Sequence, residues 1–140
     1  MSWKDQLRSD SLPWLLETDN SGVRYLALRD VLELPAEDRE LKSARKSAHK
    51  EGPIAEVLSR MEKEGYWIKP GPGYTQKYRS TVWSIILLAQ LGASVHEDKR
   101  IEQGCKYLLD QLCEGGQFTS STSGAPSGTI DCLQGNLCWS

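Results

Sequence analysis

The sequence lacks the features that mark membrane, secreted and nucleic-acid-binding proteins. Its longest apolar-rich stretch, residues 82–95, is too short and too interrupted by polar residues to span a bilayer. The first residues contain no apolar run of the kind found in signal peptides. Lys and Arg number 17 against 19 Asp and Glu, a net charge of −2, so no basic excess favours a nucleic-acid partner. We therefore expect a cytoplasmic protein without a membrane span.

The chain lacks C-x-x-C pairs, the motif typical of zinc ribbons and thioredoxin-type redox sites, although it contains four cysteines. Because no secretory signal is apparent, we expect all four to be free thiols that pack as small apolar side chains: Cys105, Cys113, Cys132 and Cys138. A structural zinc ion held by these four is disfavoured, since ligand pairs usually lie closer together in sequence.

Several catalytic signatures are also missing. No strand leads into a Gly-rich phosphate loop, and no Ser/His/Asp arrangement is apparent. The two histidines, His49 and His96, stand in sequence contexts typical of exposed residues. We therefore expect neither of them to be a catalytic base.

Residues 1–52 predict a group of short helices. Pro13 suits the first turn of a helix, and the turn at residues 19–22 ends one helix and caps the next. Residues 19–28 resemble one turn and helix of a HEAT-like repeat. Apolar residues at three- and four-residue spacing predict an amphipathic helix that ends before Pro35, with this core-facing set: Val23, Leu26, Ala27, Val31 and Leu34.

Residues 36–50 predict a highly charged helix, which is followed by Gly52-Pro53. Acidic residues interleave with its basic ones, and this mixture favours a solvated face over a patch that binds an anion or a partner. The basic and histidine side chains concerned are Arg39, Lys42, Arg45, Lys46, His49 and Lys50.

Residues 53–140 contain a sequence repeat with a period of 50 positions. Glu114-Gly115 follows Glu64-Gly65 by that offset. Each copy predicts a helix that ends in Glu-Gly plus an aromatic residue, then a loop rich in Gly, Pro or Ser, then a second, apolar helix. In the second copy we expect a flexible loop at residues 120–128 and a last helix that reaches Ser140 without a stop signal.

Together these patterns predict an all-α protein of about six to seven helices, built as helix-hairpin repeats of which the second is truncated. Residues 1–52 and 53–140 form its two parts, which we expect to pack as one domain.

The second copy resembles a known family. Residues 103–118, QGCKYLLDQLCEGGQF, are similar to the repeat of squalene cyclases and protein prenyltransferase β-subunits, with its aromatic-Leu pair, Gln and acidic-Gly-Gly-aromatic turn. Residues 57–67 keep the spacing with changed residues, and residues 81–92 are similar to the inner helix of that family. With the HEAT-like start, the chain looks most like uncharacterised bacterial members. The resemblance implies an α/α-toroid fold in which Trp67 and Phe118 clamp successive repeats together.

The same resemblance implies a candidate zinc site near the start of the last helix. Protein prenyltransferases bind zinc through an Asp and a Cys near the start of an inner helix, plus a later His, and Asp131 and Cys132 stand at such a helix start. Here the two residues are adjacent and no His follows them in the sequence. We therefore favour a helix-capping role for Asp131, a packing role for Cys132 and no bound cofactor. The Asp-x-Asp-Asp acid of class II terpene cyclases is also absent.

Two functions from different classes fit this sequence. The first is a non-catalytic scaffold that binds a protein or an apolar small molecule, with aromatic residues beside the Pro/Gly loop at the rim: Tyr66, Trp67, Tyr74, Tyr78 and Trp83. For Trp67 and Trp83, packing inside the fold is the favoured interpretation, because Trp83 lies on a helix that is apolar nearly all round.

The second is a fragment of an isoprenoid enzyme, a prenyltransferase or terpene cyclase, which requires a closed helical barrel and a metal or a buried acid. Two repeats cannot close such a barrel. We favour the scaffold, and we expect self-association through the uncapped last helix.

Overall fold

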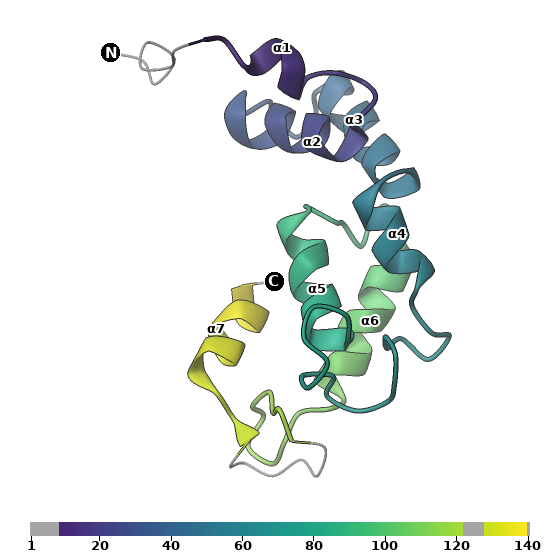
Figure 1. The fold of residues 1–140 in the computed structure, drawn as a ribbon, viewed down its shortest axis with the longest axis vertical. Helices are drawn as coiled ribbons and strands as arrows, with labels where there is room; N and C mark the ends of the chain where they lie inside the picture. The colour runs from purple at the N-terminus through teal and green to yellow at the C-terminus, as the bar shows by residue number, and fades with distance from the viewer. Residues whose placement is uncertain (1–8, 122–127, 140) are drawn as a thin grey trace. The chain divides into compact units, whose positions relative to one another are not determined.

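The computed structural model describes residues 9–121 and 128–139 (Figure 1). The expectations for the first residues and for Ser140 lie outside this range, as does most of the expected loop at residues 120–128. The described residues are mostly helical and contain no β-strand, only isolated antiparallel bridges at Met61–Trp67 and Thr119–Thr129. The all-α prediction is confirmed, while the toroid repeat type stays a prediction. None of the described helices is long and apolar enough to cross a membrane.

The chain divides into two compact units, residues Met1–Pro53 and Ile54–Ser140. The first unit contains α1 (Leu12–Leu15), α2 (Ser21–Leu26), its π-helical continuation η2 (Ala27–Val31) and α3 (Arg39–Lys50). The second contains α5 (Thr81–Gln90), α6 (Lys99–Leu109) and α7 (Asp131–Trp139), together with nearly all of α4 (Pro53–Ser59).

Side-chain caps begin the main helices of the first unit. The Val23 N–H donates to Asn20 Oδ1 at 3.2 Å, so the predicted cap of α2 is confirmed. The N–H groups of Glu40 and Leu41 donate to Asp38 Oδ1 at 2.8 and 3.0 Å. Because Asp38 is this cap, α3 begins at Arg39, three residues later than expected.

The core face of the first unit differs from the predicted one. Tyr25, Ala27 and Leu28 are buried, whereas four of the five expected residues are only half-buried. A π-helical turn carries an extra residue, so the buried face rotates relative to the spacing of a regular α-helix. From α3, the buried residues are Leu41, Ala44, Ala48 and His49.

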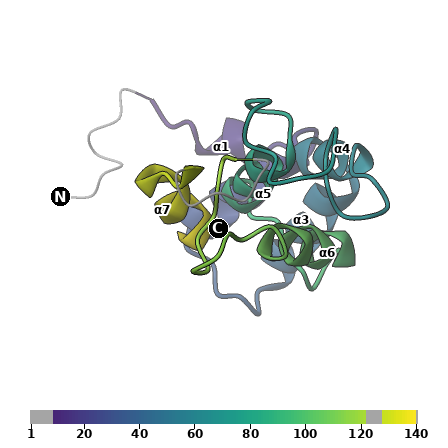
Figure 2. The ribbon, with the colours of Figure 1, turned by 90° about the horizontal axis from the view of Figure 1, so that it is seen from below.

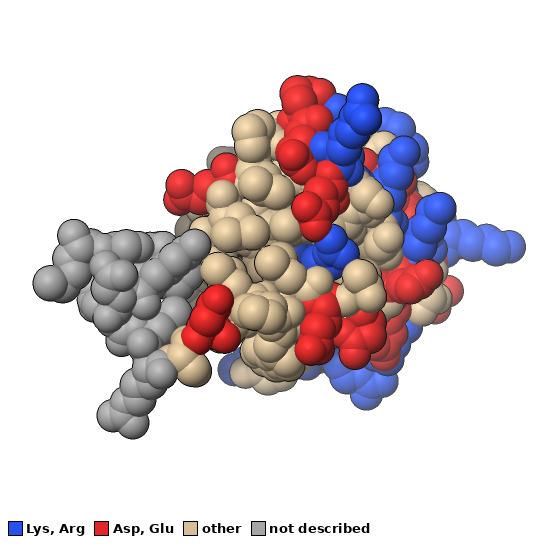
Figure 3. Space-filling model, turned by 90° about the horizontal axis from the view of Figure 1, so that it is seen from above, with Lys and Arg blue, Asp and Glu red and all other residues tan. Residues whose placement is uncertain are grey.

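The exposed context expected for His49 is wrong. Its side chain is 7% exposed, and its Nδ1 lies 2.7 Å from the Arg45 carbonyl oxygen one turn earlier. His96 is exposed as expected. Viewed from above, acidic and basic side chains interleave on the visible face, with no large area of one sign (Figure 3).

In the second unit, α5 contacts both α6 and α7. It lies between α7 on one side and α4 and α6 on the other, and α5 and α7 run in the same direction (Figures 1 and 2). α6 begins after its N-cap Asp98, whose Oδ1 accepts a hydrogen bond from the Arg100 N–H at 2.9 Å.

The 50-residue offset recurs in the helix ends. Leu109 ends α6 as Ser59 ends α4, and Asp131 begins α7 as Thr81 begins α5. However, the first helix of each copy, α4 or α6, ends five residues before the Glu of the expected Glu-Gly pair. Gly65 and Gly115 instead lie in separate turns, with φ of +100° and +101°, a backbone conformation that strongly favours glycine.

Trp67 is the central core residue of the second unit, with 2% of its surface exposed. Its indole N–H donates to the Val57 carbonyl of α4 at 2.8 Å, and its backbone N–H donates to Thr81 Oγ1 at the start of α5 at 3.1 Å. On α6, a Cβ at Gly104 would come within 3.2 Å of the indole ring, so glycine permits this close approach. Trp67 therefore connects α4, α5 and α6.

Phe118 makes a different contact from Trp67. Its side chain is half-buried, and its backbone N–H and carbonyl both bond to the Gln134 side chain of α7, at 2.9 and 2.6 Å. This turn is therefore attached to the following helix through its backbone.

α5 is apolar nearly all round, as expected, but only part of its surface is buried. Val82, Ile85 and Leu88 are buried, but Trp83 and Ile86 are half-buried and Leu87 is 38% exposed. The helix therefore presents a partly open apolar strip.

We expect Trp67→Ala to lower the free energy of unfolding by about 3–5 kcal/mol, the usual cost of removing a large buried aromatic side chain. Urea denaturation followed by circular dichroism measures this loss. The matched control is Trp14→Ala, which removes an indole that is 67% exposed and should change stability by less than about 0.5 kcal/mol. Equal effects of the two substitutions would contradict the central position of Trp67.

Candidate functional site

Three of the expected aromatic residues form one cluster at the start of α5. The ring centroids of Tyr74 and Tyr78 lie 5.6 and 5.4 Å from that of Trp83. The Trp83 indole N–H donates to the Tyr74 carbonyl at 3.0 Å, which ties the loop to the helix. We call Tyr74, Tyr78 and Trp83 the aromatic cluster.

Hydrogen bonds hold the loop that carries the cluster. The buried Ser80 hydroxyl donates to the Gln76 carbonyl at 2.8 Å and also contacts the Gly73 carbonyl. Earlier in the loop, the Gly71 N–H donates to the Tyr107 hydroxyl of α6 at 2.7 Å. These contacts make the loop a defined support for the aromatic side chains.

Tyr78 has both an unusual exposure and an unusual backbone. Its side chain is 78% exposed, although it packs on Trp83. Its φ is +66°, a left-handed conformation that costs a bulky residue about 1–3 kcal/mol. Strain of this kind is concentrated at functional sites, so it points to this part of the loop.

A groove of about 260 Å³ adjoins the cluster. It runs between α5 and α7, and its lining is Tyr78, Trp83, Ile86, Leu87, Gln90 and Asn136. Trp139, 76% exposed, stands three positions after Asn136, a spacing that places both side chains on one face of α7. An apolar groove with an amide at each side and exposed aromatics beside it is suited to hold an apolar side chain.

The segment that supplies Tyr78 and the α5 side of the groove contains positively charged residues and no carboxylate. From Gly65 to His96 the sequence contains no Asp or Glu, while Lys69, Lys77 and Arg79 are all exposed. Two of these cations flank Tyr78 directly. The sequence carries this signal, although it is hidden by the balanced charge of the whole chain.

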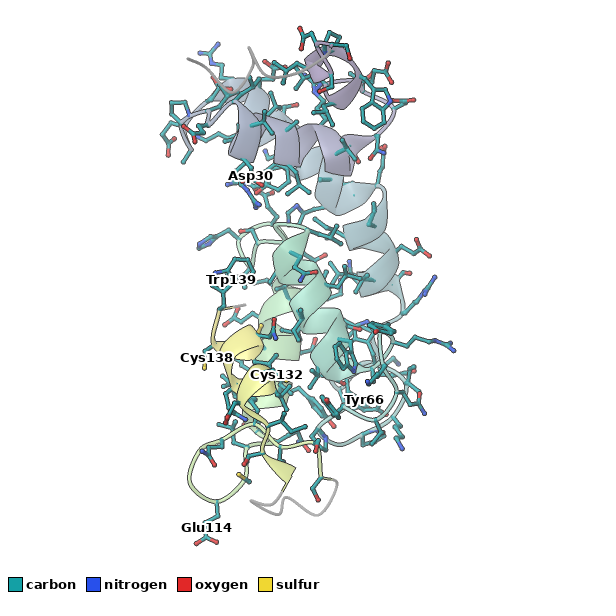
Figure 4. The ribbon with its side chains drawn as sticks, turned by 60° about the vertical axis from the view of Figure 1, so that its left-hand side comes forward. Asp30, Tyr66, Glu114, Cys132, Cys138 and Trp139 are labelled. Atoms are coloured by element: carbon teal, nitrogen blue, oxygen red, sulfur yellow. The ribbon has the colours of Figure 1, made fainter. Side chains whose placement is uncertain are left out.

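The remaining two expected rim residues lie elsewhere. Tyr66 packs on Tyr107 of α6, with ring centroids 5.4 Å apart, and lies well apart from the labelled residues of α7 (Figure 4). The pKa of Tyr66 is raised, first by desolvation and then by the negative charges of Glu64 and Glu62. Trp67 is buried, so its ring is not part of an exposed rim.

Asp131 and Cys132 are both exposed at the start of α7, where Figure 4 labels Cys132. The expectation that Cys132 packs inside the fold is therefore wrong. Among residues 9–121 and 128–139, no group of three or more His, Cys, Asp and Glu side chains is placed to hold a metal ion.

The four thiols differ in burial. Cys113 is buried and Cys105 is half-buried, whereas Cys132 and Cys138 are exposed, so the predicted packing holds for only part of the set. Burial raises the pKa of the Cys105 thiol. The exposed pair lies on α7, the last helix of the described residues.

No protein-family pattern, curated protein sequence or solved structure matches this chain. The similarity of residues 103–118 to the prenyltransferase and squalene-cyclase repeat therefore remains a prediction based on those residues.

We expect iodoacetamide at neutral pH to alkylate Cys132 and Cys138 well before Cys105 and Cys113. Exposure makes the first two accessible, while burial both hides the Cys105 thiol and disfavours its reactive thiolate. Timed quenching with peptide mass spectrometry gives the order, and urea-unfolded protein serves as the control in which all four react. Early modification of Cys113 in the folded chain would contradict this placement.

Proposed function

We propose that this chain is a non-catalytic cytoplasmic scaffold that binds an amphipathic segment of a partner protein in the groove between α5 and α7. The single observation that carries the proposal is the strained, exposed Tyr78 at the border of an apolar groove. Exposed tyrosine and tryptophan side chains beside a pocket are typical of residues that dominate binding energy.

The chemistry of the partner segment is inferred from charge. The exposed cations beside the groove, with no carboxylate in residues 65–96, complement a segment that carries acidic residues next to its apolar ones. Leu, Phe or Trp side chains of an amphipathic helix would enter the groove while acidic side chains approach Lys77 and Arg79.

We also propose that the two hairpins of the second unit are repeats of the α/α-toroid type. The 50-residue offset of their helix ends and the parallel course of α5 and α7 support this proposal. The isoprenoid-enzyme alternative predicts a metal or buried acid, and no feature of the described residues favours it over the scaffold.

The test is selection of peptides from a random display library on the immobilised full chain. We expect enriched peptides to combine apolar residues at helical spacing with Asp or Glu. Tyr74→Ser with Tyr78→Ser should weaken a selected peptide by about thirtyfold, the effect of losing a binding hot spot of about 2 kcal/mol. Fluorescence anisotropy measures the dissociation constant.

Tyr66→Ser is the matched control, because it makes the same substitution away from the groove. Its affinity should equal that of the unmodified chain, with circular dichroism verifying that each variant folds. Lys77→Glu with Arg79→Glu should also weaken the peptide, and more strongly at low salt. If only fatty acids or similar apolar molecules bind, or if the cluster variant binds normally, the proposed partner class is wrong.

Self-association through α7 is a further expectation of this surface. Trp139 and Leu87 leave apolar area exposed, and a second copy would cover it. We expect light scattering to give a mass above that of one chain, reduced to the monomer mass by Trp139→Ser. A monomer at high protein concentration would contradict this expectation.

A further inference from the structure

A second concave site lies entirely within the first unit, between α2 and α3. Its volume is about 530 Å³, about twice that of the α5–α7 groove. Its lining is rich in hydroxyl and guanidinium groups: Thr18, Ser21, Arg24, Arg39, Ser43 and Ser47. The α3 members recur at four-residue spacing, so they form one stripe along the helix.

Arg24 is the distinctive residue of this cleft. Within the described part of the chain, its Nε is the buried side-chain nitrogen that has no hydrogen-bond partner. One of its Nη atoms pairs with the Glu40 carboxylate, which also lines the cleft. A buried donor without an acceptor destabilises the folded chain, so an acceptor that reaches Nε would be favourably bound.

The Arg24 side chain is 22% exposed, which leaves it room to turn towards the cleft. For an anion in the cleft to reach the buried Nε, the guanidinium must turn away from Glu40, and Nε and Nη together then form the planar fork that binds two oxygens of one anion. Glu40 neutralises only one of the two guanidinium charges of the cleft, so Arg39 leaves a net positive charge for a ligand.

The number of donors distinguishes between anions. A carboxylate has two oxygens, which the Arg24 fork alone would satisfy. The cleft adds the Arg39 guanidinium and the hydroxyls of Ser43 and Ser47, more donors than a carboxylate needs. A tetrahedral phosphate group, with its additional acceptor oxygens, uses this set more fully.

We propose that the α2–α3 cleft is a binding site for a phosphate group, free or carried on a small polar molecule, held by Arg24 and Arg39 with Ser43 and Ser47. The sequence does not indicate this site, because Ser43 and Ser47 stand between charged residues of both signs in α3. The proposal is independent of the partner groove of the second unit.

The experiment is isothermal titration calorimetry of the full chain with inorganic phosphate, with acetate as the carboxylate probe. We expect saturable phosphate binding at one site and weaker acetate binding. Arg24→Lys keeps the charge but removes the fork, and Arg39→Gln removes the free charge. Each should weaken phosphate by about tenfold or more, the value of a charge-assisted hydrogen bond.

The matched control is Lys46→Gln, which removes the same charge from an exposed position of α3 that does not line the cleft. Phosphate binding should be nearly unchanged in this variant. Substitution of Arg24 also disturbs its ion pair with Glu40, so Ser43→Asp provides a second test. The Asp carboxylate at this exposed position would place a negative charge in the cleft and abolish phosphate binding. Absence of saturable binding, equal loss in Lys46→Gln and Arg39→Gln, or acetate binding as tight as phosphate would overturn the proposal.

Discussion

Burial of the Trp67 indole is the contact on which the second unit depends. One bulky ring packs against α6 at Gly104, and its N–H satisfies a carbonyl near the end of α4. The backbone of the same residue bonds to Thr81, where α5 begins. Because three helices meet at this residue, the chain between α4 and α5 must return to the core at Trp67 instead of continuing the helix.

This constraint positions the aromatic cluster. With the loop fixed at Trp67 and closed again by Ser80, the intervening residues have little freedom, and Tyr78 adopts a left-handed backbone conformation. The energy of core packing thereby maintains an exposed and strained aromatic side chain beside the α5–α7 groove. The first unit offers a contrasting surface, a hydroxyl-lined cleft in which Arg24 retains an unsatisfied donor. The two units thus carry sites of opposite chemical character.

Local signals in the sequence predicted much of the fold. The turn at residues 19–22, whose Asn20 caps α2, follows from short-range hydrogen bonding and was predicted. The 50-residue repeat also recurs in the helix ends. What failed depends on tertiary contacts: residues 60–64 have good helix propensity, but burial of Trp67 ends α4 at Ser59. The burial of His49 similarly depends on how α3 packs against α2, which the sequence pattern does not specify.

The candidate site was predictable only in part. Tyr74, Tyr78 and Trp83 stand near one another in sequence, and the structure brings them together, whereas Tyr66 is drawn to Tyr107 of α6. The groove itself needs Asn136 from a helix more than forty residues further along the chain. Neither periodicity nor composition specifies which faces of α5 and α7 meet, since that depends on how the two hairpins stack.

We propose that the α5–α7 groove beside the aromatic cluster binds an acidic amphipathic segment. The most direct measurement is an NMR titration of isotope-labelled chain with a selected peptide, following the indole N–H of Trp83 and the side-chain amides of Gln90 and Asn136. We expect these three signals to shift together and to saturate at one dissociation constant. Shifts confined to Tyr66, Tyr107 and their neighbours, with the groove signals unmoved, would contradict it.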